Sequence, residues 1–288
     1  MDLTSLVQGG ASGALLASLY VLVALGLTIE FSLLRIINFA HGDFYMLGAV
    51  AAYYLFAEVA LPFPLVVVVA AVGGVILGFL AERTLFRRFH EDLLGAFVLS
   101  LGLAWVLEMA VVGKFGAYPK GLPPVVAGVS RFGQVAISND RIMVIVVGSL
   151  IVAAISLYVT KSQVGRAMRA VAQNKDAAAL LGINPVFVGT IGFVLGTALA
   201  TLAGALVSPI FSVDPQMGVG LTIKAFVIVI IGGMGSIPGA VLAGILLGLF
   251  EGVGGIYVDN AQLAVLEFLV IILFLILRPK GIMGSAEA

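Results

Sequence analysis

The sequence predicts an all-α membrane protein, a polytopic bundle of helices in a single transmembrane domain over residues 1–288. The composition supports this fold class, because 61% of the residues are hydrophobic and 10% are charged, with a mean hydropathy of +1.20. A soluble domain carries about 25% charged residues. The apolar residues also form long runs, and a run of ~20 residues crosses a bilayer as a helix. Polar or glycine-rich breaks within the runs predict that some helices are broken or re-entrant.

Nine apolar runs are candidate membrane spans. They cover residues 12–34, 42–57, 64–82, 93–112, 141–160, 187–208, 222–232, 238–254 and 261–277. Several are shorter than the ~20 residues of a perpendicular helix, which predicts tilted or broken segments. The run 222–232 is the weakest candidate for a full span. We therefore expect eight or nine crossings, or more if the long interval 113–140 dips back into the membrane.

The positions of the cations predict the orientation in the membrane. Lys and Arg are concentrated in the connections at 83–88 and 161–175 and in the tail at 278–280. Cytoplasmic loops are enriched in these residues, so we expect the N-terminus outside and the C-terminus in the cytoplasm. The first cation is Arg35, so we expect the first run to be kept as a membrane helix rather than removed as a signal peptide. Four cations in the interval 113–141 oppose this orientation.

Several classes of function are disfavoured by what the sequence lacks. Its formal net charge is zero, so nothing indicates nucleic acid. It has no cysteine, and His41 and His90 are too far apart to predict a metal centre. It contains no GxxxxGK[ST] loop, so any work driven by ATP requires another subunit. We expect no enzyme activity, metal or cofactor in this chain.

The interval from Lys161 to Pro185 is the long polar stretch that has a helical pattern. Its apolar residues recur at helical spacing and face away from its polar ones. The apolar residues are Val164, Ala167, Met168 and Val171, and the polar ones are Arg166, Arg169 and Gln173. Asn174 is the predicted N-cap of a second short helix, which Gly182 ends. We expect two short helices at a membrane face; the alternative is a basic loop that fixes topology or binds lipid headgroups.

Two breaks interrupt the apolar pattern in corresponding settings, which predicts a weak internal repeat and a transport pathway between its halves. The first break supplies Asn38, His41 and Asp43 as pathway or gating candidates. Alternatively, Asp43 caps the next helix while Asn38 and His41 lie at the membrane interface. The second break, residues 232–239, has four glycines and a proline. In a helix each glycine costs about 1 kcal/mol and a proline about 3.

The candidates in the second break are Gly232, Gly233, Gly235 and Ser236. Irregular backbone inside a membrane must be buried in protein or line a water-filled cavity. The alternative is a simple turn outside the membrane.

Ionisable residues inside the runs are further functional candidates, because an unpaired charge in a bilayer costs several kcal/mol. They are Glu30, Glu108, Lys224, Glu251 and Glu267. Most lie near predicted helix ends, where snorkelling or capping suffices. Glu30 and Glu267 are the deepest, and they leave an ion-coupled secondary transporter open as an alternative function.

Three segments carry a resemblance to a known family. They are INFAHGDFYMLGA (37–49), GRAMRAVAQNKDAAALLGIN (165–184) and GGMGSIPGAVLAG (232–244). In the second, Asp176-Ala177-Ala178 and Gly182 resemble the "EAA" loop of ABC importer permeases, with Asp where that family usually has Glu. Together the segments resemble the shorter permease subunit of branched-chain amino acid ABC importers, and the resemblance covers essentially the whole chain.

The resemblance implies a transport subunit in the bacterial inner membrane that moves leucine, isoleucine or valine. It implies two ATPase subunits that hold ATP and Mg²⁺, a second homologous permease, and an extracytoplasmic substrate-binding protein. The implied contact with the ATPases is the loop 161–186. Its implied coupling residues are Gly165, Arg166, Arg169, Asn174, Asp176, Ala177, Ala178 and Gly182. Arg166 and Arg169 would meet acidic ATPase groups. Similar permeases for urea or short amides are the alternative within the family.

Overall fold

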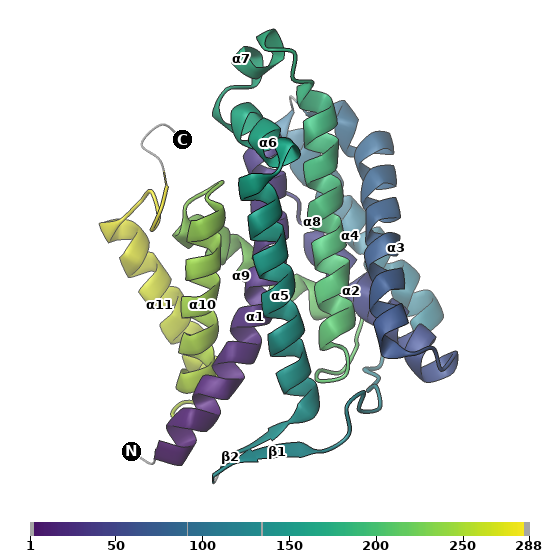
Figure 1. Ribbon diagram of the computed structural model, residues 1–288, viewed down its shortest axis with the longest axis vertical. Helices are drawn as coiled ribbons and strands as arrows, with labels where there is room; N and C mark the ends of the chain where they lie inside the picture. Colours follow the sequence, from purple (N-terminus) through teal and green to yellow (C-terminus); the bar gives the residue numbers. More distant parts are fainter. Residues whose placement is uncertain (1–2, 91, 134, 285–288) are drawn as a thin grey trace.

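The computed structural model describes residues 3–90, 92–133 and 135–284, and it is a bundle of long helices (Figure 1). The membrane-type helices are α1 Leu3–Leu34, α2 His41–Ala52, α3 Phe63–Thr84, α4 Leu93–Phe115, α5 Asn139–Lys161, α8 Pro185–Val207, α9 Met217–Gly232, α10 Ile237–Gly254 and α11 Asn260–Leu277. The shorter elements are η1 Tyr53–Glu58, η2 Phe86–Phe89, β1 Val129–Phe132, β2 Val135–Ser138, α6 Gln163–Gln173 and α7 Lys175–Leu180.

Seven helices in the described part of the chain are long and apolar enough to cross a membrane: α1, α3, α4, α5, α8, α10 and α11. The shorter apolar helix α9 and the 12-residue helix α2 complete the bundle. The protein is therefore a multi-pass membrane protein, as predicted. The start of α1 and the strands β1 and β2 lie at one end of the bundle, while α6, α7 and the C-terminal segment lie at the other (Figure 1).

The interval 113–140 adds no membrane helix in its described residues. It contains the end of α4, an irregular segment and the antiparallel pair β1–β2, in which Val129 lies opposite Ser138. This hairpin lies at the end of the bundle (Figure 1), so the additional crossing considered for this interval is not formed.

The two short helices begin inside the bundle rather than at its ends. Nε2 of His41, the first residue of α2, lies 3.1 Å from the carbonyl oxygen of Val23, an interior residue of α1. At the start of α9, a Cβ placed on Gly42 would lie 2.1 Å from the carbonyl oxygen of Gly218. Helices α2 and α9 thus begin at one depth in the bundle, and α9 includes residues before the predicted run 222–232. This confirms the expectation of broken helices.

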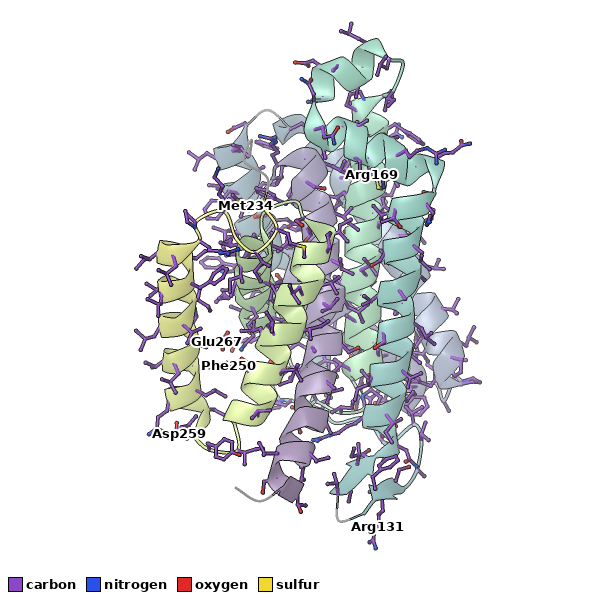
Figure 2. The ribbon with its side chains drawn as sticks, turned by 60° about the vertical axis from the view of Figure 1, so that its left-hand side comes forward. Arg131, Arg169, Met234, Phe250, Asp259 and Glu267 are labelled. Carbon is purple, nitrogen blue, oxygen red and sulfur yellow. The ribbon has the colours of Figure 1, made fainter. Side chains whose placement is uncertain are left out.

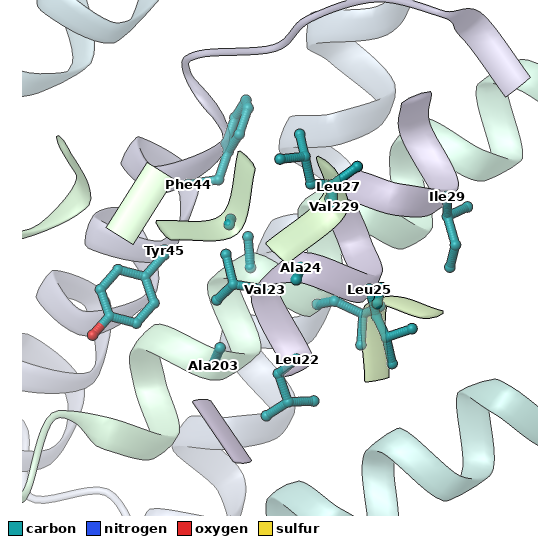
Figure 3. Close-up of a cluster of buried hydrophobic side chains, with 14 of the residues drawn as sticks. Leu22, Val23, Ala24, Leu25, Leu27, Ile29, Phe44, Tyr45, Ala203 and Val229 are labelled. Atoms are coloured by element: carbon teal, nitrogen blue, oxygen red, sulfur yellow. The ribbon is translucent and has the colours of Figure 1, made fainter. Parts of the chain in front are cut away.

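Helix α1 is the central element of the hydrophobic core. The side chains of Val23, Ala24 and Leu25 are fully buried, and Figure 3 shows them surrounded by residues of α2, α8 and α9. Close contact between helices requires small residues at the crossing points. A Cβ on Gly26 would lie 2.7 Å from the carbonyl oxygen of Gly196, so glycine allows α1 and α8 to touch there.

The second break was expected inside the membrane, but the structure places it at the end of the bundle. Residues 233–236 form a turn between α9 and α10 at the end of the bundle, where a Cβ on Gly235 would lie 3.4 Å from Ser32 in the last turn of α1. The first break, residues 35–40, instead leads from the end of α1 back into the bundle. The two breaks therefore lie at different depths, so the two halves of the expected repeat do not match at the breaks. The simple turn, weighed above as the alternative, describes the second break better.

Candidate functional site

Helices α6 and α7 project from the end of the bundle that carries the C-terminal segment (Figure 1). Side-chain caps define both helices. The Ser162 hydroxyl accepts a hydrogen bond from the Gly165 amide at 2.9 Å, and the Asn174 side chain accepts one from the Ala177 amide at 2.9 Å. The predicted N-cap at Asn174 is confirmed. The cap at Ser162 was not predicted, although serine before a helical pattern is a standard N-terminal signal.

The end of α7 confirms the role of Gly182. This residue has a φ of +83°, the left-handed conformation that glycine adopts easily, and its amide donates to the Ala179 carbonyl at 3.0 Å. The Ile183 amide donates to the Ala178 carbonyl at 3.1 Å and closes the turn. Asn184 then caps α8 by accepting from the Phe187 amide at 3.1 Å. Pro185 occupies the first turn of α8, where a missing N–H is tolerated.

Other implied coupling residues, besides Asn174 and Gly182, also make contacts inside this chain. A Cβ on Gly165 would lie 2.0 Å from the Val159 carbonyl oxygen, so α6 lies directly on the end of α5. The Arg169 guanidinium donates to the carbonyls of Val159 and Thr160, which lack helical partners at the end of α5. Ala178 is 1% exposed, so it packs within the subunit rather than presenting a surface.

The tip of the projection is exposed and partly apolar. Leu180 and Leu181 are 90% and 81% exposed. Both lie on the projection, beyond the ends of the membrane helices. Arg166, Asp176 and Ala177 are exposed as well. The two adjacent leucines form a small exposed apolar surface on the extramembrane projection. Sequence reasoning missed the leucines, because an apolar pair in a short helix is usually assigned to the core.

A buried ion pair anchors the bundle just below this projection. The Glu82 carboxylate is fully buried and accepts hydrogen bonds from Arg87 Nε at 3.1 Å and Nη2 at 2.8 Å. Arg87 Nη2 also donates to the Thr190 hydroxyl at 3.0 Å, which links α3 to the start of α8. Nε2 of His90 lies 3.4 Å from Glu82 Oε1. Burial lowers the pKa of His90, and the charges of Lys175 and Arg87 add to this against the opposing effect of Glu82.

A cavity of about 410 Å³ lies between the projection and the bundle. Its wall combines residues of α1, α4, α6, α7 and α8. Among them are Ser32, Leu93, Val171, Lys175 and Val186. The projection is therefore not packed solidly against the bundle at this point, and it has room to shift.

Inside the bundle, Asn38 and His41 meet Glu30, a deep acidic residue that sequence reasoning had not connected to them. Asn38 Nδ2 donates to Glu30 Oε2 at 3.0 Å, and His41 Nδ1 lies 3.1 Å from Glu30 Oε1. All three side chains are at most 2% exposed. These residues bind the first break to α1, and neither Asn38 nor His41 faces an open path or the membrane interface in this structure.

Asp43 is separate from this cluster. It is 3% exposed and lies in the first turn of α2, where a carboxylate is favoured by the helix dipole. It does not cap the helix, because the N-cap position is Ala40 and the Ala40 amide donates to the Asn38 side chain at 3.1 Å. The predicted proximity of Asp43 to the helix N-terminus is thus confirmed, while its capping role is wrong.

A second cluster joins four helices at mid-depth of the bundle. Lys224 of α9 pairs with Glu251 of α10 and, at 3.2 Å, with Glu267 of α11. The hydroxyl of Tyr20 in α1 donates to Glu251, and the Lys224 ammonium lies 5.4 Å from the Tyr20 ring centroid. In Figure 2, Glu267 lies between the ends of α11, well away from both Asp259 and Met234. The sequence analysis listed Lys224, Glu251 and Glu267 as candidates but did not predict that they form ion pairs with one another.

The pathway candidates of the second break are held by the C-terminal segment. The Ile282 amide donates to the Ile231 carbonyl at 2.7 Å, and the Met283 amide donates to the Gly232 carbonyl at 3.1 Å. Gly233 and Gly235 have φ values of +99° and +83°, which fit the tight turn. Ser236 caps α10 by accepting from the Gly239 amide at 3.2 Å. Protein groups thus satisfy the carbonyls of Ile231 and Gly232 at the end of α9, just before the turn.

Comparison with known proteins identifies the family. The family model described as "Branched-chain amino acid transport system / permease component" matches residues 10–277. The chain belongs to this permease family. No solved structure gives a significant match to it.

Curated relatives of this permease extend over nearly its whole length. BraD of Pseudomonas aeruginosa is 33% identical, over 98% of this chain and 96% of its own. LivH of Escherichia coli K12 is 32% identical, over 96% of this chain and 94% of its own. Both are described as high-affinity branched-chain amino acid transport system permease proteins. LivM of Salmonella typhimurium, another permease of such a system, is 25% identical over 96% of this chain and 70% of its own.

Proposed function

We propose that this permease is a membrane subunit of an ATP-driven importer that carries leucine, isoleucine and valine into the cytoplasm. The names of the BraD and LivH relatives support this substrate class. The observation that carries the proposal is the projecting pair α6–α7 with its exposed Leu180 and Leu181. A passive channel needs no such docking surface. In this proposal two separate ATPase chains bind ATP and Mg²⁺ and cover the projection.

The contacts of the projection supply a mechanical link to the bundle. Arg169 and Gly165 hold α6 on the end of α5, and the capped turn at Gly182–Asn184 joins α7 directly to α8. A push on the leucine pair therefore moves α5 and α8 together. Helix α8 in turn contacts α1 through Gly26 and Gly196. Closure of the ATPases would switch the pore by such a rigid-body displacement. Reactions on the substrate are not part of this mechanism.

We place the projection in the cytoplasm of a bacterium and the β1–β2 hairpin outside its inner membrane. The cations at 83–88 and 161–175 lie at the projecting end, in agreement with the positive-inside rule. Two of the four cations of the interval 113–141, Lys120 and Arg141, have contacts within the chain. Lys120 lies 4.3 Å from the Phe115 ring centroid, and Arg141 Nη1 donates to the Ser12 hydroxyl at 3.4 Å.

The remaining partners in this proposal are a second homologous permease and a substrate-binding protein. The match to LivM supports a partner of the same family, because LivM is a permease of a branched-chain system. The binding protein would deliver substrate at the end that carries the hairpin.

The test is purification of the tagged permease after gentle solubilisation, followed by identification of the chains that accompany it. We expect two P-loop ATPases and a second permease, and ATP-dependent uptake of leucine when the complex and its binding protein are reconstituted in liposomes. Uptake of urea or a short amide in place of leucine would correct the substrate. Uptake by this chain alone without ATP would contradict the proposal.

A further inference from the structure

The Lys224 cluster lies at a depth where a charge cannot face lipid. Lys224 is the eighth residue of the 16-residue helix α9, and Glu267 is the eighth of the 18-residue helix α11. The Lys224 side chain is nevertheless 29% exposed, and that of Glu251 is 12% exposed. An ionised side chain at the centre of a bilayer costs about 2.5–3.5 kcal/mol by the lowest scales. The surface beside Lys224 must therefore be covered by protein or by water.

The residues around Lys224 favour protein over water. The exposed residues Val219, Gly220, Ile223 and Ile230 lie on one side of α9, and together with the partly exposed Lys224 they form one stripe. Apart from Lys224 it has no polar side chain, whereas residues that line a water-filled path in a membrane are commonly polar. A largely apolar stripe with one polar cluster is typical of contacts between membrane helices.

Gly220 lies on the same stripe as the charged cluster, which distinguishes it from open glycines on apolar faces, such as Gly73 on α3. A Cβ placed on it would meet no described atom within 4 Å, so its lack of a side chain serves no packing within this part of the chain. Its neighbour Gly218, by contrast, touches the backbone of Gly42. Small residues on exposed faces of membrane helices allow the backbone of another helix to approach closely.

The exposed faces of α3 and α5 lack such charges and fit lipid. The exposed stripe of α3 contains Val68, Val72, Ile76 and Leu80, all at least 50% exposed. Helix α5 exposes Val146, Leu150 and Leu157, and its sequence has no ionisable carboxylate, ammonium or guanidinium group between residues 142 and 160. These faces can contact hydrocarbon without penalty, so they provide matched controls for α9.

We propose that the α9 stripe is the surface on which the second permease chain packs. This inference rests on the proposed function, and it assigns that partner to one face of the bundle. The cluster has two carboxylates for one ammonium, so the partner places a hydrogen-bond donor beside Glu251 or Glu267 and excludes lipid from Lys224. Gly220 admits the backbone of the partner helix.

The absence of cysteine from the sequence makes a direct test possible. Ile223→Cys carries a photoreactive maleimide at a position that is 44% exposed on the stripe, and Val68→Cys and Leu150→Cys carry it on the control faces. The labelled importer is purified as the whole complex and illuminated. We expect cross-linking to the second permease from position 223 and at least tenfold less from positions 68 and 150.

Three results would overturn the inference while leaving the proposed function intact. They are cross-linking to the second permease from a control position instead, modification of Ile223→Cys in the complex by a membrane-impermeant maleimide, and absence of a protein cross-link at 223 in a complex that contains both permeases. If no second permease accompanies an active transporter, the proposed second permease is wrong, and no partner is then assigned to the α9 stripe.

A glycine substitution gives a second readout. Gly220→Leu adds a side chain into space that is open in the single chain, so the isolated permease keeps its thermal stability, while the second permease is lost from the purified complex. Gly73→Leu is the matched control, because a Cβ on Gly73 also meets no described atom within 4 Å and lies on α3. Equal recovery of the second permease with both variants would contradict the assignment.

Discussion

Nδ1 of His41 lies 3.1 Å from Oε1 of Glu30, and both side chains are buried in the centre of the bundle. His41 Nε2 faces the Val23 carbonyl, which only accepts, so this nitrogen carries a proton. His41 and Glu30 thus join the start of α2 to α1. This pair holds the start of α2 at mid-depth, where helices α2 and α9 begin together.

We predict that Glu30→Ala destabilises the permease strongly, because it leaves Asn38 and His41 buried without their acceptor. Leaving a buried polar group without its hydrogen-bond partner costs about 1–3 kcal/mol. Glu30→Gln keeps an acceptor oxygen and has a smaller effect. The measurement is the thermal midpoint of the solubilised protein, with exposed Glu58→Ala as the control. A midpoint for Glu30→Ala equal to that of the control would show that the pair does not hold the first break.

The pattern of apolar runs predicted most of the helices, and the misses have physical reasons. Helix α1 begins well before residue 12, because its glycines contact α10: a Cβ on Gly9 would lie 3.0 Å from the Gly252 carbonyl oxygen. Helix α9 begins at Met217 because Gly218 packs on Gly42, although glycine lowers intrinsic helix propensity. Tertiary contacts decide both boundaries, and a single sequence does not contain them.

The candidate site was predictable where the determinants are local. Asn174 and Gly182 act within a few residues of themselves, so their roles followed from sequence. The partners of Lys224 and Glu30 lie on other helices or across the first break, and no spacing rule connects Lys224 to Glu267. Arg169 lay between these cases. It has helical spacing from Arg166, which the sequence shows, but its hydrogen bonds to the end of α5 could not be read from that spacing.

Arg166 and Arg169 should therefore differ in their roles. Arg169→Met removes hydrogen bonds from a charged donor to the last carbonyls of α5, which contribute about 1.5–3 kcal/mol each. We expect a lower thermal midpoint and weaker coupling of ATP hydrolysis to transport. Arg166 is exposed, with one bond to the Lys161 carbonyl at 3.3 Å, so Arg166→Met leaves the midpoint nearly unchanged. Equal midpoints for both variants would refute this difference.

Leu180 and Leu181 should carry the contact with the ATPases. We predict that Leu180→Asp together with Leu181→Asp lowers the amount of ATPase recovered in the purified complex at least tenfold. The folding of the permease should not change, because these side chains are almost fully exposed and contribute little to its core. Val126→Asp, an exposed apolar position in the interval before β1, is the control and keeps the ATPases. Normal ATPase recovery with the double variant would disprove the docking assignment.

His90 should make the projecting end sensitive to acid. Its pKa is lowered in the folded protein, chiefly by burial, so the unfolded chain binds the proton more readily. The stability that this group contributes is present above the ordinary histidine value of 6.5 and is lost as the pH falls below it. We expect His90→Gln to flatten the decline of the thermal midpoint between about pH 7 and pH 5, a range set by the unperturbed histidine pKa. A decline as steep as that of the unsubstituted protein would exclude this role.

The charge balance of the Lys224 cluster predicts a hierarchy among substitutions. Lys224→Met leaves the carboxylates of Glu251 and Glu267 without a cation, and removing one partner of a buried ion pair costs about 3–5 kcal/mol. We therefore expect little folded Lys224→Met in the membrane. Adding Glu251→Gln and Glu267→Gln restores neutrality and keeps an acceptor for the Tyr20 hydroxyl, so the triple variant should fold nearly as well as the unsubstituted protein. The measurement is the yield of monodisperse permease by size-exclusion chromatography. If the triple variant were no better than Lys224→Met, an unpaired charge would not be the cause, and the shape of the lysine side chain would have to be responsible.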